Sequence, residues 1–513
     1  MKPEEPLHKI RLPREFADTR GARPAEPVMV EPGFDEAPVT ELSPDRPSMP
    51  TCPLCAHGET PAAHDDLIAL NQYQTAQPDL LAGAITASHP ELLMETVVHR
   101  GCLERIEREL QHAQIICGEH EPRFIDLTLG PVPILPTSLR MGAEESLTGR
   151  GVTMAFVDSG FYPHPDLMEP EGRVIAMYDA VVGREIANIR RLAGRRPPVQ
   201  AWHGTMAAAT AAGSGYCSGG DYRGIASNAR LVLVRAMTRH YRIRTPQVVR
   251  ALQWIQANRE RYDIRVVNLS LGVDETTDSL EHPVIALVEQ LSAEGVVIVA
   301  ASGNNPSVSI KPPGAAPSAI TVGGYNDHNS TSWMHRELWH SSYGRTPGGA
   351  RKPELLGPAI WVAAPILPNT TVREEADALF QLACAGDEEL MGMIPRLAAR
   401  TAIAERIAAA TGPVHVRSMV LARIAEEKLI TPGYKHVDGT SFAAPIVSSV
   451  VAQMLEARPH LRPEEVKEIL TATALLLPGV PGDVQGYGLV APDRAIAATL
   501  SLDERHGQVA GKG

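Results

Sequence analysis

Three short motifs carry the residue types that nucleophilic catalysis by a serine requires. Asp158 begins an Asp-Ser-Gly turn after an apolar run, and His203 precedes a run of small residues. Ser441 lies in Asp438-Gly-Thr-Ser-Phe-Ala-Ala-Pro445, where a Gly-Thr-Ser turn places a hydroxyl at the start of a predicted helix. A serine becomes a good nucleophile when a neighbouring base, usually histidine, removes its proton. Taken one at a time, the first motif also suits an ordinary turn and the second a structural histidine.

The segments around these motifs alternate between apolar runs of strand length and stretches of helix length. This alternation predicts βαβ units and a mostly parallel sheet covered on both faces. Active sites in such sheets lie at the carboxyl ends of the strands, and Asp158 directly follows the first of them. The predicted strands are 152–157, 231–236, 265–270 and 296–301, and the predicted helices between the later strands are 245–259 and 279–294.

Together, in the chain order Asp, His, Ser, the motifs resemble the active-site motifs of the subtilisin-like serine proteases. The resemblance runs from about Gly151 to Leu500. It implies a three-layer α/β fold with a mostly parallel central sheet, and serine endopeptidase activity through an acyl-enzyme on Ser441. Four further segments carry the resemblance: Val266-Val-Asn-Leu-Ser-Leu-Gly272, Ala300-Ala-Ser-Gly-Asn304, Gly314-Ala-Ala-Pro-Ser-Ala-Ile-Thr-Val-Gly323 and Gly486-Tyr-Gly-Leu-Val-Ala-Pro-Asp493.

The resemblance implies a role for each residue of the catalytic group. His203 would act as the base on Ser441, and Asp158 would hold the imidazole in the correct tautomer. The side-chain amide of Asn304 and the backbone N–H of Ser441 would bind the oxyanion of the tetrahedral intermediate. Asn305 follows directly, so the alternative reading of the pair is two turn residues; the Ala-Ser-Gly-Asn match favours Asn304.

The resemblance also implies which segments bind the substrate. An extended peptide would pair with the strand end at 270–272 and enter a specificity pocket that 301–303 completes. The alternative reading of these residues is an ordinary buried strand end. The basic segment Arg239-His-Tyr-Arg-Ile-Arg244 replaces the family's small-residue strand and suggests a preference for acidic substrates. The residues expected at the substrate are Ser270, Leu271, Gly272, Ala301, Ser302 and Gly303.

Outside the matched motifs, composition and periodicity predict further parts of the chain. Residues 1–50 are rich in Pro and charge without periodicity, which indicates a disordered or loosely docked tail. A small helical module is predicted over 51–120, with helices at 67–70, 80–85, 92–98 and 103–110, then a linker at 121–150. The peptidase domain spans 151–500, with a helical insertion at 371–430, including helices at 394–410 and 419–428, and a tail at 501–513. The insertion is expected to form a lid or exosite.

The cysteines of the N-terminal module have the spacing of a metal site. Cys52 and Cys55 form one pair of ligands, and His99 and Cys102 form a second at the start of a predicted helix. Tetrahedral Zn²⁺ accepts sulfur and nitrogen donors from two such pairs, so we predict a structural zinc site. A reduced thiol pair or a labile disulfide is the alternative. Other side chains could replace one of the four ligands, namely His57, His64 and Cys117.

No cofactor is expected for catalysis. Members of the family often bind Ca²⁺, which needs six to eight oxygen ligands. Only Asp166 in His164-Pro-Asp-Leu167 matches a family ligand in this sequence. We therefore do not expect calcium.

Composition and charge narrow the class of partner. The net charge is −12, which argues against a general affinity for nucleic acid. The sequence has no run of 18 apolar residues and no apolar core of a signal peptide in residues 1–49, so we expect no membrane span and a cytoplasmic protein. The expected partner is a protein or peptide substrate, and residues 1–150 are expected to regulate the protease, including by autoinhibition.

Two other functions stay open at this point. In one, the protease fold is an inactive scaffold that recruits a partner, although a scaffold has no physical reason to retain Asp158, His203, Asn304 and Ser441 together. In the other, the same acyl-enzyme is resolved by an amine, which makes the protein an acyl transferase or peptide cyclase. The sequence does not separate hydrolysis from this transfer.

Overall fold

The computed structural model describes two short strands and most of the chain after residue 133. These are β1 (Leu67–Ala69), β2 (Val97–His99) and residues 134–273, 279–333, 336–346, 348–410 and 412–510, with side chains up to residue 502. By its internal contacts the chain divides into the units Met1–Asp65 and Asp66–Gly513. Every described residue belongs to the second unit.

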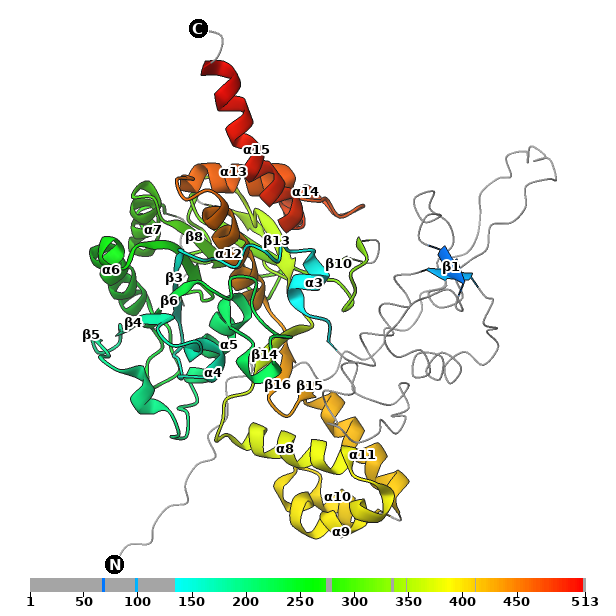
Figure 1. Cartoon of the computed structure of the whole chain (residues 1–513). Coiled ribbons are helices and arrows are strands. Elements are labelled where there is room, and N and C mark those ends of the chain that lie inside the picture. The colour runs from blue at the N-terminus through cyan, green and yellow to red at the C-terminus, as the bar shows by residue number, and fades with distance from the viewer. Residues whose placement is uncertain are drawn as a thin grey trace, which may run out of the picture. The chain divides into compact units, whose positions relative to one another are not determined.

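A nine-stranded sheet forms the centre of the described part of the chain (Figure 1). Its order is β10-β9-β8-β7-β3-β6-β4-β5, with β13 also paired to β9. The inner strands run parallel, whereas β5 and β10 pair antiparallel at the two ends of that order. The strands are β3 (Thr153–Asp158), β4 (Val174–Asp179), β5 (Arg184–Glu185), β6 (Arg230–Arg235), β7 (Ile264–Leu269), β8 (Val297–Ala301), β9 (Ile320–Asn326), β10 (Glu337–Leu338) and β13 (Leu355–Pro358).

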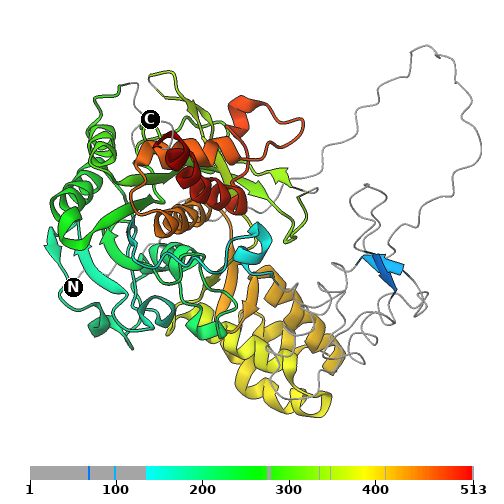
Figure 2. The ribbon, with the colours of Figure 1, turned by 45° about the horizontal axis from the view of Figure 1, so that its top comes forward.

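Helices cover both faces of this sheet, as Figures 1 and 2 show. Side chains of β3 alternate between two apolar clusters, with Met154 and Phe156 in one and Ala155 and Val157 in the other. The first cluster includes α5 (Ala201–Ala212), α12 (Thr440–Ala457), α13 (Pro463–Thr473) and α15 (Pro492–Ala510), and the second includes α6 (Thr245–Tyr262) and α7 (Pro283–Ala293). The predicted α/β class with a mostly parallel sheet is therefore confirmed.

Strand β3 is the point where the chain order of the sheet reverses. Its neighbours are β6 on one side and β7 on the other, all three parallel. Crevices at the carboxyl ends of such strands are where α/β proteins bind ligands. Asp158 is the last residue of β3 and therefore lies at this edge.

The segment between β14 (Val362–Pro365) and β15 (Leu429–Thr431) is helical and has its own apolar core. The predicted single helix over 394–410 is wrong, because α9 ends at Leu397. Just after this end, the Thr401 hydroxyl donates to the carbonyl of Ala398 at 2.8 Å. The helix expected over 419–428 begins earlier, at Pro413. The helices are α8 (Thr371–Cys384), α9 (Asp387–Leu397), α10 (Ala404–Ala408) and α11 (Pro413–Glu426). After β15, strand β16 (Tyr434–Val437) pairs with both β14 and β15 and leads to Ser441.

The predicted linker at 121–150 is wrong for its described part, because residues 134–150 pack against the part of the chain that holds the nine-stranded sheet. Ile134 and Met141 are buried, and helix α3 (Thr137–Met141) carries the buried Arg140. The Arg140 guanidinium lies 2.5 Å from the Asp327 carboxylate. A buried charge needs such a partner, so this pair fixes the segment to the loop after β9.

The predicted helix at 67–70 of the N-terminal module is also wrong, and so is the end of the helix predicted at 92–98. Strand β1 occupies Leu67–Ala69, and strand β2 begins at Val97 and runs to His99; the two pair antiparallel, with Leu67 opposite His99. Each strand has only three residues, which is too short a segment to show a helical or a strand period. The helices expected at 80–85 and 103–110 lie outside the described residues. At the other end of the chain, α15 extends past residue 500 to Ala510, into the predicted tail.

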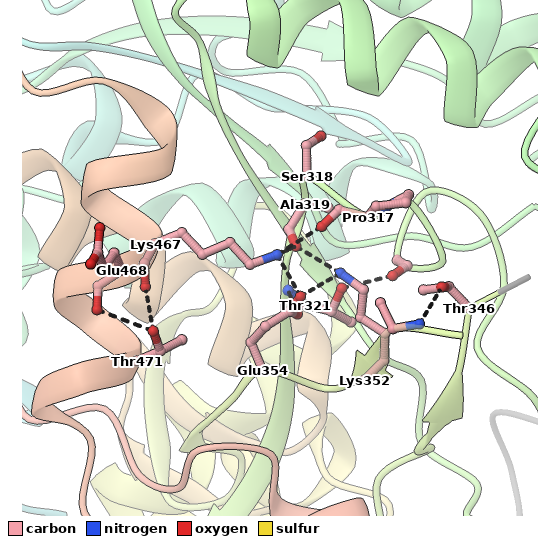
Figure 3. A network of polar contacts seen from close by, with 12 residues as sticks. Pro317, Ser318, Ala319, Thr321, Thr346, Lys352, Glu354, Lys467, Glu468 and Thr471 are labelled. Atoms are coloured by element: carbon pink, nitrogen blue, oxygen red, sulfur yellow. Dashed lines mark hydrogen bonds and ion pairs between the residues drawn. The ribbon is translucent and has the colours of Figure 1, made fainter. Parts of the chain in front are cut away.

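A buried polar network ties α13 to the sheet (Figure 3). The carboxylate of Glu354 accepts from Lys352 at 2.7 Å, from Lys467 of α13 at 2.6 Å and from the backbone N–H of Thr321 at 2.8 Å. Both ammonium groups also donate to the carbonyl of Ala319. The network therefore fixes the start of β9.

Among the helices of the described residues, none is both long and apolar enough to cross a membrane.

Candidate active site

The structure brings Asp158 and His203 into direct contact. Nδ1 of His203 lies 2.7 Å from Oδ1 of Asp158, which is 1% exposed. The same carboxylate oxygen accepts the backbone N–H of Ser159 at 2.5 Å. A carboxylate on Nδ1 fixes the imidazole tautomer in which Nε2 is the free base. The pair therefore has the arrangement of a general base with its orienting acid.

Helix α5 approaches the end of β3 closely enough to make this contact. A Cβ on Gly204 would lie 2.3 Å from the carbonyl oxygen of Gly160, so no larger residue fits after His203. The Ser159 hydroxyl donates to the carbonyl of Gln200 at 2.6 Å and accepts the N–H of Gly204 at 3.3 Å. The Asp-Ser-Gly turn and the first turn of α5 therefore hold each other in place.

Aromatic rings and charge set the environment of His203. Its ring lies edge-on to Trp202, with centroids 5.3 Å apart, and 5.5 Å from the ring of Phe442, the residue after Ser441. Burial disfavours protonation of the imidazole, but the charge and hydrogen bond of Asp158 together outweigh it and raise the pKa of His203 above its ordinary value. His203 is therefore a stronger base than a free histidine.

Ser441 is the second residue of α12, where backbone N–H groups have no partner within the helix. Gly439 before the helix has φ 129°, a conformation that favours glycine. The Ser270 hydroxyl donates to the carbonyl of Ser441 at 2.7 Å and accepts from the Asn268 amide at 2.9 Å. Asn268 in turn accepts from Ser448 of α12 at 3.1 Å. This chain of hydrogen bonds fixes the start of α12 against β7.

The described residues show no hydrogen bond between the Ser441 hydroxyl and His203. Such bonds often form fully only once a substrate is bound. The contact between the His203 and Phe442 rings shows that α5 and the start of α12 face each other.

Asn304 is oriented by the residue before the serine. Its Oδ1 accepts the backbone N–H of Thr440 at 3.0 Å and the Thr440 hydroxyl at 2.8 Å. The Thr440 hydroxyl also accepts the N–H of Gly303 at 3.2 Å. With its oxygen held in this way, the amide NH₂ of Asn304 is left as a donor beside Gly439. Apart from its place in the Gly-Thr-Ser turn, nothing in the local sequence pattern indicates this role of Thr440.

The expected substrate-binding residues follow β7 and β8, although they differ in what they expose. Ser270 is directed to Ser441, whereas Leu271 is 6% exposed and belongs to the cluster under α6 and α7. Only the backbone of Leu271 can therefore reach a substrate, while Gly272 is exposed. In the second segment, Ala301 ends β8, Ser302 is buried with its N–H donating to Val322, and Gly303 has φ 107°.

The basic segment after β6 forms a tight turn rather than a strand. The N–H of Thr238 donates to the carbonyl of Arg242 at 2.9 Å, and Tyr241 has φ 57°. Arg239 and Arg244 are exposed. Because β6 is parallel to β3 and adjacent to it, this turn lies at the same edge of the sheet as Asp158.

The surroundings of Asp166 do not fit calcium. One oxygen of its carboxylate accepts the N–H of Cys217 at 3.0 Å, and the other accepts the hydroxyl of Tyr434. His164 and Cys217 offer nitrogen and sulfur within 4.8 Å of the carboxylate, not the oxygens that Ca²⁺ requires. Nδ1 of His164 also already accepts the N–H of Asp166 at 3.2 Å. Protein donors therefore satisfy this buried carboxylate.

The predicted zinc ligands are mostly beyond what the structure describes. Cys52, Cys55 and Cys102 lie outside the described residues. His99 is the last residue of β2. The zinc site stays a prediction.

Comparisons with known proteins identify the class. The model of the subtilase family, peptidase S8, matches residues 149–490. The chain belongs to the subtilase family, which confirms the resemblance seen in the sequence.

Individual relatives match only part of their own length. Serine protease AprX of Bacillus subtilis is 30% identical over 334 residues, 64% of this chain and 62% of that protein. Subtilisin BL of Lederbergia lenta is 30% identical over 189 residues, 36% of this chain and 59% of that protein. Fervidolysin from Fervidobacterium pennivorans, a keratinolytic enzyme related to subtilisin, aligns with TM-score 0.47 and 21% identity, covering 74% of this chain and 49% of that one. The chain thus spans less than two thirds of the length of these proteins.

Proposed function

We propose that this chain is a serine endopeptidase that hydrolyses peptide bonds through an acyl-enzyme on Ser441. The observation that supports this most is the 2.7 Å contact between His203 Nδ1 and Asp158 Oδ1 at the end of β3. His203 lies on α5, which faces the start of α12, the helix that carries Ser441. Membership of the subtilase family supports the same reading.

The reaction would proceed in two halves. Nε2 of His203 takes the Ser441 proton as the oxygen attacks the substrate carbonyl, and the resulting oxyanion accepts from the Asn304 amide and the Ser441 N–H. His203 then gives the proton to the leaving amine, which releases the first product and leaves an ester on Ser441. In the second half, His203 takes a proton from water as the water oxygen attacks the ester, and it then returns this proton to the Ser441 oxygen as the ester bond breaks, which releases the carboxylic acid product and restores the free serine. Asp158 stays ionised and stabilises the imidazolium each time it forms.

Labelling with a fluorophosphonate probe tests the nucleophile. The full chain and its Ser441→Ala variant would be compared, with the modified residue found by peptide mass spectrometry. We expect labelling at Ser441 that the substitution abolishes. A chain that is never labelled and cleaves no protein would favour the inactive scaffold, and a joined rather than hydrolysed product would favour the cyclase.

We also propose that the residues before 134 regulate the protease, in a role that includes processing or degradation of intracellular proteins. Because Arg140 is buried against Asp327, a truncation that tests this should keep residue 134 onward. Autoinhibition predicts faster labelling of the truncated chain than of the full chain. Equal rates would contradict it.

Zinc in the N-terminal module is a separate proposal. Metal analysis of the purified chain should find about one zinc per chain, lost in a Cys52→Ser and Cys55→Ser variant. An equal zinc content in both proteins would contradict the site.

A further inference from the structure

The segment between β8 and β9 closes on the strand end that is expected to bind the substrate. The N–H of Val273 donates to the carbonyl of Pro312 at 3.0 Å. A Cβ on Gly314 would lie 3.0 Å from the carbonyl oxygen of Ala301. The residues 310–314 therefore contact both expected substrate segments, the one after β7 and the one at the end of β8.

Lys311 is the charged residue of this segment, and its side chain runs along Gly272. A Cβ on Gly272 would lie 3.6 Å from Cβ of Lys311 and 3.9 Å from its Cδ. Gly272 is exposed and Lys311 is partly exposed. The methylene chain of Lys311 thus lies beside Gly272, which has no side chain of its own. Gly272 ends the segment 270–272, and Ser270 of that segment is hydrogen-bonded to Ser441.

We propose that Lys311 selects substrates with an acidic residue at P1, the residue whose carbonyl is attacked. This inference rests on the proposed endopeptidase function. A peptide paired with the backbone of 270–272 and acylating Ser441 would place its P1 side chain next to Gly272. A carboxylate there meets the Lys311 ammonium, and the bound peptide excludes water and strengthens the attraction.

A second, separate segment favours acidic substrates in the same way. The turn after β6 carries exposed Arg239 and Arg244 at the sheet edge where Asp158 lies. The chain as a whole has a net charge of −12, so these basic side chains at the candidate active site are opposite in sign to the net charge of the chain. Electrostatic complementarity of this kind favours the binding of acidic peptides, and the attraction weakens as the salt concentration rises.

The test compares peptides that differ only at P1, with Glu, Gln, Leu or Lys at that position. Charge-assisted hydrogen bonds predict that the wild type cleaves the Glu peptide with a kcat/KM roughly 10- to 100-fold above that of the Gln peptide. The Lys311→Gln variant should lose this preference, and Lys311→Glu should shift it to the Lys peptide. Arg494→Gln makes the same change of charge on an exposed position of α15 and should leave the preference unchanged.

Fluorophosphonate labelling of each variant separates this inference from the proposed function. If Ser441 is labelled in all variants but Glu and Gln peptides are cleaved equally by the wild type, Lys311 does not select an acidic P1 and the endopeptidase proposal stands. The same holds if Lys311→Gln changes all four peptides by one common factor, since that indicates packing against Gly272. If no variant is labelled and no peptide is cleaved, both proposals fail. Equilibrium binding of the Glu and Gln peptides to Ser441→Ala gives the comparison without catalysis, and equal affinities would overturn the inference.

Discussion

The Thr440→Val substitution tests how the oxyanion donor is held in place. Thr440 gives two hydrogen bonds to Oδ1 of Asn304, one from its N–H at 3.0 Å and one from its hydroxyl at 2.8 Å. Valine has nearly the same shape and keeps the first bond but removes the second. The amide of Asn304 then loses one of the two contacts that aim its NH₂ at the oxyanion.

The size of the effect follows from one hydrogen bond. A neutral hydrogen bond contributes about 0.5–1.5 kcal/mol, so kcat should fall about 2- to 13-fold if this energy is needed mainly in the transition state. KM should stay unchanged, because the ground-state carbonyl does not yet carry the charge. Asn304→Ala removes the donor itself. In subtilisin, a member of the same family, that loss costs about 10²–10³ in kcat, and we carry the magnitude over.

A double-mutant cycle shows whether Thr440 acts through Asn304. Steady-state kinetics on one peptide would compare wild type, Thr440→Val, Asn304→Ala and the double variant. We expect Thr440→Val to have no further effect once Asn304 is absent. An equal fall in both backgrounds would refute the reasoning, because the hydroxyl would then act by another route, such as its bond with Gly303.

Three further predictions concern charge and metal. Asp158 raises the pKa of His203, so the acid limb of kcat/KM against pH should lie above the ordinary histidine value of 6.5; Asp158→Asn should lower this midpoint and reduce kcat by about 10⁴. An unchanged midpoint would contradict the coupling. Protein donors satisfy Asp166, so millimolar calcium should leave the Tm unchanged, while Tyr434→Phe should lower stability by about 1–3 kcal/mol. A calcium-dependent rise in Tm would count against this account. Burial lowers the pKa of Lys352 to about 8 from 10.5, so the unfolded chain binds more protons between these values and the free energy of unfolding should rise with pH across them. Lys352→Met should remove that part of the rise, and identical pH profiles for the two proteins would exclude it.

The sequence predicted the parts of the fold that depend on strong local patterns. Four of the nine strands of the sheet, β3, β6, β7 and β8, and the helices α6 and α7 follow apolar periodicity, and the structure places each within a few residues of its predicted bounds. The family resemblance implies a contact between Asp158 and His203, and the structure has this contact. Asp158 ends β3 and His203 lies in the first turn of α5, so both stand at the same edge of the sheet.

Other features depend on contacts between distant residues, and no local pattern reports them. Arg140 anchors residues predicted as a linker, but its partner Asp327 lies far along the chain. The strands β1 and β2 are short enough that only their pairing defines them. No motif contains Lys311, and its place beside Gly272 arises from the folding of the segment between β8 and β9. The position of Lys311 three residues before the matched motif at Gly314 is the one feature of the sequence that points to it.

Hydrolysis in water labelled with ¹⁸O tests the central claim most directly. The full chain would be incubated with a peptide substrate, and the products would be weighed by mass spectrometry beside those of Ser441→Ala. We predict one ¹⁸O atom in the new carboxyl terminus of each cleaved peptide and no cleavage by the variant. Cleavage that persists without Ser441, or products joined without ¹⁸O, would contradict a serine endopeptidase.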